Sequence, residues 1–442
     1  DYDQILVDGV LDLSGATLSF SGGMGTVPLN TLVTLISNSS NEDTIVDSGE
    51  DPPSTVSPVE GATVSIGGID FTIFYSGGDG NDVVLVESSP SDIVYVDDDT
   101  WMDFTDGTTI RDADFGTNSS QPAILGVTAF RTVGEGLTAI TSDGTVAVNG
   151  GTYHENVMLL NSQTLRVTGV DSTQAVIIDS VGGESGTTIT LEGFSTLAVG
   201  DSGDQTIRSV INGSGGLIKL GSGTLTVSGM NTYSGETLVS AGVLKLGSSA
   251  ALGDAVASDE TTGTTVASGA TLDLDGYRDV EEAVFLSGNG VLDSVDEGIG
   301  ALINSNAGEA SLNGTITLEA DSRIGGTGMA TYSGAVNGSF ALTFVGSGDK
   351  TFDVSVGGVD SLNQIIQDDK SGTIQFSEDV TLGVGGASFN GDVTFYAVNP
   401  DLTFISIGDI TFGDATSDLL TADGAAGTST IIQSTMGSIT LL

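Results

Sequence analysis

The chain has 442 residues, of which 59 are Asp or Glu and only 10 are Lys or Arg, so its formal net charge at pH 7 is −49. Such a surface repels nucleic acid and anionic lipid, and the absence of Cys excludes disulfides, thiolate metal sites and a cysteine nucleophile. The acidic excess fits two explanations that can coexist, namely solubility in salty water and the binding of cations.

The composition predicts an all-β protein, because 65 Gly and only 7 Pro accompany a hydrophobic fraction of 38%. Apolar and polar residues alternate almost from end to end, which disfavours disorder. Apolar runs stay well below the length of about 18 residues that a transmembrane helix needs, so we expect no membrane insertion. The chain begins at Asp1 without Met or a visible signal peptide, and we expect it to be a piece of a longer protein.

Residues 1–88 predict a first β unit with strands at 5–7, 10–13, 32–36, 63–66 and 71–75. Residues 37–60 are polar and contain three Pro, so we expect a long loop there. From YDQILVDGVLDLSGATL to GGDGNDVVL, this unit resembles the module that closes autotransporter-type β-repeat regions in large bacterial surface proteins. The resemblance implies a closing-type β module that spans residues 1–88.

The string GGDGNDVVL at 77–85 also matches one nonapeptide of the calcium-binding RTX type, in which Gly carbonyls and an Asp carboxylate bind Ca²⁺. The candidates in it are Gly77, Asp79, Gly80 and Asp82. An RTX roll needs consecutive nonapeptides, and this chain has one. The alternative is the ordinary end of the closing module, without a metal.

A second acidic stretch lies in residues 89–126, where close carboxylates repel each other unless a cation or water lies between them. Its candidates are Asp97, Asp98, Asp99, Asp103 and Asp106, and the alternative is a solvated acidic loop. From both stretches together, the predicted calcium ligands are Asp79, Asp82, Asp97, Asp99 and Asp103. We expect no cofactor to be required, and calcium is the one candidate ligand.

Residues 89–140 predict an acidic linker that ends in a short capping helix. Val133, Leu137 and Ile140 fall on one helical face, and Thr132 with Glu135 has the spacing of a capping box. We expect the helix to cover the apolar end of a stack of β-strands.

Residues 141–442 predict one long solenoid, because short alternating strands recur between Gly-, Ser- and Asn-rich corners without helical interruption. GTYHENV at 151–157 resembles the opening coils of pectin-lyase-like β-helices. Residues 221–253 closely resemble the autotransporter-associated β-strand repeat. The resemblances imply a right-handed parallel β-helix, and coils of roughly 20–25 residues are typical of such repeats. Stacked core residues are expected at Phe340, Phe344, Phe352, Phe376, Phe389, Phe395, Phe404 and Phe412.

The sequence does not predict an enzyme. His154 is the single histidine, the ten basic residues are scattered, and we found no GxSxG, P-loop or Rossmann motif. Carboxylate pairs of the kind that β-helical polysaccharide enzymes use cannot be singled out among 59 acids. We therefore assign no catalytic and no cofactor-binding residues.

The prediction for function is a structural, extracellular β-solenoid of a bacterial surface filament, stalk or S-layer-like assembly. Its subunits would join head to tail through the terminal strands, 4–7 and 430–442, because an open solenoid end is a row of unpaired backbone groups. The alternative is an adhesin or carbohydrate-binding module that uses the flank of the β-helix. The expected partners are further copies of the chain, in a head-to-tail homopolymer or a tandem repeat array, and glycans or other cell-surface components, but not nucleic acid.

Overall fold

The structure is a computed structural model. It describes residues 5–7, 11–12, 32–38, 45–46, 62–66, 69–77, 82–87, 91–97, 101, 104, 106–110, 113, 123–149, 151–160, 163–167, 176–178, 188–193, 195–200, 203–254, 263–293, 297–368, 372–397, 401–413, 419–424 and 429–441. The chain divides into two compact units, Asp1–Val176 and Ile177–Leu442.

The first unit begins with a small sheet in the order β1-β3-β7-β6-β5, in which all pairs are antiparallel except β1 with β3. Its strands are β1 (Ile5–Val7), β3 (Leu32–Asn38), β5 (Thr63–Ile66), β6 (Ile69–Gly77) and β7 (Asp82–Glu87). Phe71, Ile73 and Tyr75 alternate along β6 and are buried in one cluster with residues of β3 and β7. Two short strands, β2 (Leu11–Asp12) and β4 (Ile45–Val46), form a separate parallel pair.

A parallel stack follows in the same unit. β8 (Ser91–Val96) pairs in parallel with both β11 (Ala129–Phe130) and β12 (Ile140–Val148), and β12 pairs with β15 (Thr164–Val167). β8 lies inside the stretch that the sequence predicts as an acidic linker. The single tryptophan, Trp101, is buried against this stack with Tyr95 and Leu125. The remaining strands of the unit are β9 (Thr109–Ile110), β10 (Ala123–Ile124), β13 (Gly151–Tyr153) and β14 (Val157–Leu159).

The predicted helix is present as α1 (Val133–Ala139), and its N-cap is Thr132, whose side chain accepts a hydrogen bond from the Glu135 N–H at 3.2 Å. Two further N-terminal amides, those of Val133 and Gly134, donate to the carboxylate of Glu155 at 2.7 and 2.9 Å. A carboxylate is favourable there because the start of a helix carries unpaired N–H groups and partial positive charge.

Gly136 brings α1 close to the stack. A side chain at that position would lie 3.0 Å from Val96 of β8 and 3.1 Å from Val146 of β12. The helix therefore packs directly on apolar side chains of the parallel strands, as the sequence predicts.

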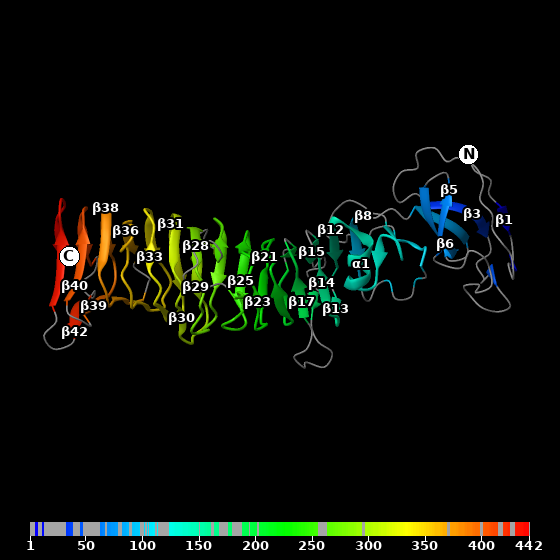
Figure 1. The fold of residues 1–442 in the computed structure, drawn as a ribbon. Coiled ribbons are helices and arrows are strands. Elements are labelled where there is room, and N and C mark those ends of the chain that lie inside the picture. The colour runs from blue at the N-terminus through cyan, green and yellow to red at the C-terminus, as the bar shows by residue number, and fades with distance from the viewer. Residues whose placement is uncertain are drawn as a thin grey trace. The chain divides into compact units, whose positions relative to one another are not determined.

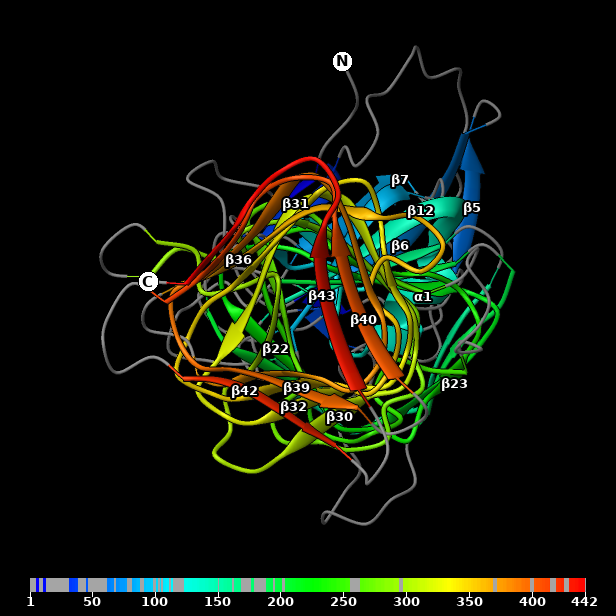
Figure 2. The same ribbon diagram turned by 90° about the vertical axis from the view of Figure 1, so that its left-hand side faces the viewer.

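The second unit is a continuous stack of coils, and most coils contribute one strand to each of three parallel faces (Figures 1 and 2). Seen along the stack in Figure 2, β40 and β43 form one side, β39 and β42 a second, and β31 and β36 a third.

Face 1 contains β17 (Thr188–Leu191), β20 (Val210–Gly213), β23 (Thr232–Tyr233), β30 (Ala310–Leu312), β32 (Ala330–Tyr332), β35 (Lys350–Phe352), β37 (Ile374–Phe376), β39 (Val393–Ala397) and β42 (Leu420–Gly424). Face 2 contains β18 (Thr196–Val199), β21 (Gly216–Lys219), β24 (Thr237–Val239), β26 (Thr264–Val266), β28 (Val284–Gly288), β33 (Val336–Asn337), β40 (Asp401–Ser406) and β43 (Ser429–Ser434). Face 3 contains β16 (Val176–Ile178), β19 (Gln205–Ile207), β22 (Thr224–Val227), β25 (Gly242–Leu246), β27 (Ala270–Asp273), β29 (Leu302–Asn304), β34 (Ala341–Phe344), β36 (Leu362–Gln367), β41 (Ile410–Phe412) and β44 (Ile439–Leu441). Two long strands, β31 (Ile316–Gly326) and β38 (Val380–Phe389), run from face 2 into face 3.

Aromatic side chains stack through the core of the later coils. Tyr332, Phe352, Phe376 and Phe395 occupy one register column of face 1, with ring centroids 5.1, 5.5 and 5.9 Å apart in turn. Seven of the eight predicted core phenylalanines are buried. Phe340 is the exception with 38% exposure, so that prediction was wrong.

The parallel solenoid, the small N-terminal β module and the single short helix confirm the predicted fold class. The right-handed sense of the coils stays a prediction from the resemblance. So do the predicted domain boundaries at 88 and 140. No helix in the described part of the chain combines the length and apolar character of a membrane span.

Candidate functional site

The predicted calcium ligands are only partly covered by the structure. Asp79, Asp99 and Asp103 lie outside the described residues, and Asp82 begins β7. Asp97 directly follows β8 and is buried, with 2% of its surface exposed. Among the described residues, no group of three or more His, Asp or Glu side chains could hold a metal ion. Calcium binding at these five residues therefore stays a prediction.

Asp106, a further candidate in the acidic stretch, is exposed and paired with a basic side chain. Its Oδ1 lies 2.9 Å from Nη1 of Arg131, and the same guanidinium donates hydrogen bonds to the carbonyls of Trp101 and Phe104. Arg131 thus ties the segment after β8 to the start of α1. His154 is exposed at the corner formed by GTYHENV.

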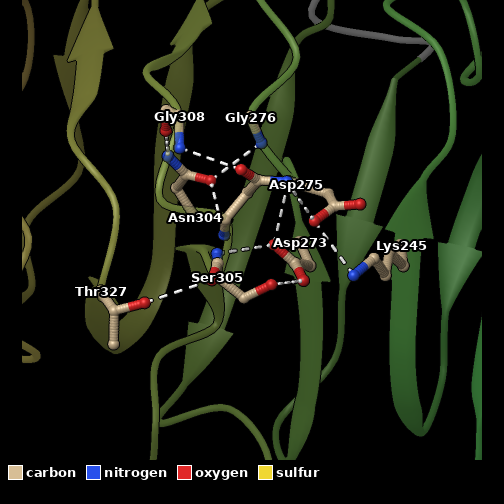
Figure 3. Close-up of polar contacts among 9 residues, drawn as sticks. Lys245, Asp273, Asp275, Gly276, Asn304, Ser305, Gly308 and Thr327 are labelled. Atoms are coloured by element: carbon tan, nitrogen blue, oxygen red, sulfur yellow. Dashed lines mark hydrogen bonds and ion pairs between the residues drawn. The ribbon is translucent and has the colours of Figure 1, made fainter.

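A polar ladder occupies one corner of the second unit, where β27, β29 and β31 end (Figure 3). Asp273, the last residue of β27, is buried, and its Oδ1 accepts hydrogen bonds from the Asp275 and Ser305 amides, both at 3.0 Å. The Ser305 hydroxyl donates to Oδ2 of Asp273 at 2.5 Å. A carboxylate with three donors is stable in the interior without a metal ion.

Asn304, the last residue of β29, connects three successive coils. Its Oδ1 accepts hydrogen bonds from the amides of Gly276, in the preceding coil, and Asn306, in its own. Its Nδ2 donates to the carbonyls of Gly308, in its own coil, and Met329, in the following one. The side chain is completely buried, so these four bonds use the full hydrogen-bonding capacity of the amide.

The ladder continues outward to a half-exposed ion pair. Nζ of Lys245, on β25, lies 3.0 Å from Oδ1 of Asp275 (Figure 3). Asp275 has a positive φ of 45°, which places it in the left-handed region at this tight turn. The ladder therefore runs from β25 to the start of β32 and holds consecutive coils in register.

A second set of acidic residues satisfies backbone groups between coils. Seven exposed aspartates each accept, through Oδ1, the N–H of the residue stacked on them in the following coil, at sequence separations between 20 and 29 residues. Six stand at or immediately before the start of a strand, and Asp321 stands at the corner within β31. We call them the strand-start aspartates: Asp204, Asp321, Asp349, Asp379, Asp392, Asp401 and Asp409, with the partners Thr224, Ala341, Thr373, Thr403, Leu419, Ser429 and Ser438.

Hydrogen bonds favour the charged form of one of these carboxylates, that of Asp409. The amide and then the hydroxyl of Ser438 lower the pKa of Asp409 below its ordinary value. Part of the acidic surface of the second unit therefore has a structural explanation, since each strand-start aspartate completes a backbone group of the next coil.

Two buried lysines donate hydrogen bonds to backbone carbonyl groups, whereas the strand-start aspartates accept them from backbone amides. Nζ of Lys219 donates to the carbonyls of Gly221 and Ala241 at 2.9 and 3.1 Å, and Nζ of Lys350 donates to those of Gly346 and Gly348. Burial lowers the pKa of each ammonium to about 8, although Asp204 and Asp349 respectively act in the opposite direction. Both lysines are fixed inside corners, so neither is available to a large substrate.

These polar contacts among the described residues stabilise the stack of coils. The ladder, the strand-start aspartates and Lys219 bond to neighbouring coils, and Lys350 bonds within its own coil. Sequence reasoning missed these roles. The printed sequence does contain a signal for the strand-start aspartates, because Asp recurs directly before predicted strands.

Comparisons with known proteins agree with the resemblance seen in the sequence. Residues 217–246 match the passenger-associated-transport-repeat, a stretch that runs from β21 to the end of β25. Over 214 residues the chain is 32% identical to the adhesin BmaC autotransporter of Brucella suis biovar 1 (strain 1330). That alignment covers 47% of this chain but only 6% of the relative. No solved structure gives a significant match.

Proposed function

We propose that this chain is an adhesive β-solenoid segment of a bacterial surface protein, similar to part of an autotransporter passenger. The observation that carries the proposal is the 32% identity over 214 residues to an autotransporter named as an adhesin. The passenger-associated repeat within the solenoid supports the same class of surface protein. The predicted alternative, an adhesin, thus has more support than the predicted filament subunit.

The fold supplies a mechanism for adhesion. Stacked coils repeat the same corner and the same outward-facing row at intervals of about 4.8 Å, so weak contacts can be arranged in lines along the solenoid. The polar ladder and the strand-start aspartates keep the coils in register, so these lines stay straight. Binding then depends on the outward side chains of several coils together, and no catalytic step is required.

The experiment is to display residues 1–442 on a non-adherent bacterium and measure retention under flow on layers of host cells and on protein-coated and glycan-coated surfaces. The same carrier without the chain is the control, and antibody labelling confirms equal surface density. Retention above the control on at least one surface is the expected result. Retention equal to the control on every surface would contradict the adhesive function.

Head-to-tail assembly is a second proposal. In β43 and β44 the apolar residues Ile431, Ile439 and Leu441 have exposed fractions of 48%, 46% and 68%. Contact with another copy would cover them. Sedimentation velocity of the purified chain should then show oligomers that Ile431→Lys with Leu441→Lys abolishes, whereas a monomer at all concentrations argues against assembly.

A further inference from the structure

The corner between face 2 and face 3 carries one large exposed apolar side chain in each of five successive coils. These residues are Phe340, Val359, Val384, Ile407 and Met436, with exposed fractions of 38%, 83%, 73%, 37% and 84%. We call this set the apolar ridge. Apolar residues scattered singly over a surface are ordinary, but a repeated position in consecutive coils forms a continuous strip.

Hydrogen bonds join neighbouring corners that carry ridge residues. The Asn363 N–H donates to the Phe340 carbonyl at 2.9 Å, and the Val359 N–H donates to Oδ1 of Asn337 at 3.1 Å, so these corners contact each other. The Met436 N–H donates to the Ile407 carbonyl at 3.2 Å. At about 4.8 Å per coil, five coils place the ridge over roughly 20 Å.

Glycine leaves these side chains uncovered. Val384 stands between Gly383 and Gly385, and Met436 precedes Gly437. A Cβ at Gly408 would lie 2.2 Å from the Val384 carbonyl oxygen, so this corner requires glycine for the close approach of two coils. On the sides where glycine stands, no neighbouring side chain shields the ridge.

Acidic side chains predominate around the ridge, and Arg323, two residues after Asp321 in β31, donates a hydrogen bond to the Gly298 carbonyl. Asp321, Asp360 and Asp409 are exposed at the same corner of their coils. From residue 324 to the end of the sequence, Lys350 and Lys370 are the only basic residues. Lys350 is buried, and Lys370 is outside the described residues. A second copy of the chain that approached the ridge side-on would bring its own net charge of −49 against these aspartates and be repelled there, and so would an anionic lipid surface.

A helix fits this strip in its spacing. An α-helix rises about 5.4 Å per turn, close to the roughly 4.8 Å between coils, so apolar residues on successive turns can meet successive ridge residues. Lysine or arginine beside that apolar stripe would face the aspartates.

We propose that the apolar ridge is the adhesive contact surface, and that its partner is a cationic amphipathic helix on another protein. This inference rests on the proposed adhesive function and names the partner class of that function. Apolar contact supplies the affinity, while charge complementarity selects against acidic partners and makes binding weaker at high salt.

The test uses the whole chain and a fluorescent Leu/Lys peptide of about 18 residues whose leucines share one helical face. Anisotropy titrations compare the wild type with the ridge variant Val359→Ser/Val384→Ser/Met436→Ser. These three side chains are largely exposed, so the fold should persist, and circular dichroism checks it. The matched control, Met230→Ser/Met329→Ser/Leu419→Ser, changes exposed apolar residues at the corner between face 3 and face 1.

We expect the ridge variant to bind the peptide on the order of tenfold more weakly than the wild type, and the control variant to bind as the wild type does. A scrambled peptide of the same composition, and a Leu/Glu peptide, should bind weakly to all three. Equal binding of the Leu/Lys peptide by the ridge variant would overturn the proposal. A ridge variant that lost self-association but kept peptide binding would also overturn the proposal.

The two proposals can fail separately. If the wild type does not bind the peptide while the displayed chain is still retained under flow, the ridge proposal is wrong and the adhesive function stands. If the displayed chain is not retained on any surface while peptide binding depends on the ridge, the adhesive function is wrong and the peptide-binding surface stands.

Discussion

The hydroxyl of Thr264 donates a hydrogen bond to Oε1 of Glu282 across 2.7 Å inside the second unit, while Oε2 of Glu282 is buried without a hydrogen-bond partner. Only 2% of Glu282 is exposed. Burial raises the pKa of this carboxyl to about 8, and the bond from Thr264 opposes part of that rise. Glu282 is therefore protonated and neutral in the folded chain at pH 7.

Replacement of Glu282 by Gln should raise stability at pH 8 and leave it almost unchanged at pH 4. The pKa of Glu282 is higher in the folded chain than its ordinary value of 4.5, so the folded chain holds a proton that the unfolded chain releases. Its favourable contribution is complete below pH 4.5 and is lost as the pH rises to about 8. We expect a gain of roughly 3 kcal/mol for Glu282→Gln at pH 8, measured by urea unfolding.

Glu281→Gln is the matched control, because Glu281 is the exposed neighbour of Glu282 and accepts a hydrogen bond from Asn313. It should leave the pH dependence of unfolding as it is in the wild type. If Glu282→Gln unfolded with the same pH dependence as the wild type, the pKa of the Glu282 carboxyl in the folded wild type would be close to its ordinary value of 4.5.

Asn304→Ala should cost about 2–4 kcal/mol of unfolding free energy, because buried donors and acceptors of three coils lose their partner. Asn306→Ala, at an exposed position of the same ladder, should cost less than about 1 kcal/mol. Both are measured by denaturant unfolding. Equal costs would mean that the four hydrogen bonds of Asn304 contribute no more than surface contacts.

Asp379→Ala should destabilise the second unit by about 1 kcal/mol, because the Thr403 amide loses its acceptor at 2.7 Å. Amide exchange of Thr403 should also become faster. Glu378→Ala removes the preceding exposed acid and is the control. If both variants have the same exchange rate at Thr403, the strand-start aspartates do not hold the next coil.

Phe352→Ala should cost about 3–5 kcal/mol, because the side chain is buried in the aromatic column between Tyr332 and Phe376. Phe340→Ala, at a position with 38% exposure, should cost clearly less. Thermal unfolding followed by circular dichroism compares the two. A larger loss at Phe340 would contradict its place on the surface.

Calcium should raise the midpoint of thermal unfolding if the predicted ligands form a site. Removal of calcium with a chelator should then lower it, and Asp97→Asn with Asp99→Asn should abolish the difference. Asp392→Asn, at a strand-start aspartate in the second unit, is the control that keeps the calcium response. An unfolding midpoint independent of calcium would argue against the site.

Most strands of the second unit could be predicted from the sequence, because alternation and glycine corners identify short stacked strands directly. Within residues 221–253, the alternating runs TLTV and TLV of the printed sequence coincide with β22 and β24 at both ends. The same rule failed at Phe340. It shares the parity of Leu342 and Phe344, but β34 begins at Ala341, and Gly338 turns the backbone with a φ of 122°.

The roles of the polar residues could not be predicted in the same way, because they depend on which residues stack. Coils differ in length, so Thr224 pairs with Val243 whereas Phe404 pairs with Ile432. Unless it is known which residues pair between coils, the hydrogen-bond partners of Asp379 and Asn304 cannot be predicted from their spacing in the sequence. The apolar ridge was missed for the same reason, since its five members are unevenly spaced along the chain.

In every hydrogen bond of the strand-start aspartates, an amide of the following coil donates to a carboxylate of the preceding coil. This hydrogen-bond pattern therefore gives the stack a direction from its N-terminal to its C-terminal coils. A coil that has already folded presents these fixed carboxylate acceptors as a template for its successor, whereas the strand-start aspartates present none to its predecessor. We expect the second unit to fold progressively from its N-terminal coils. A chain of the same composition with the order of its coils reversed should lose these carboxylate acceptors for the following coil.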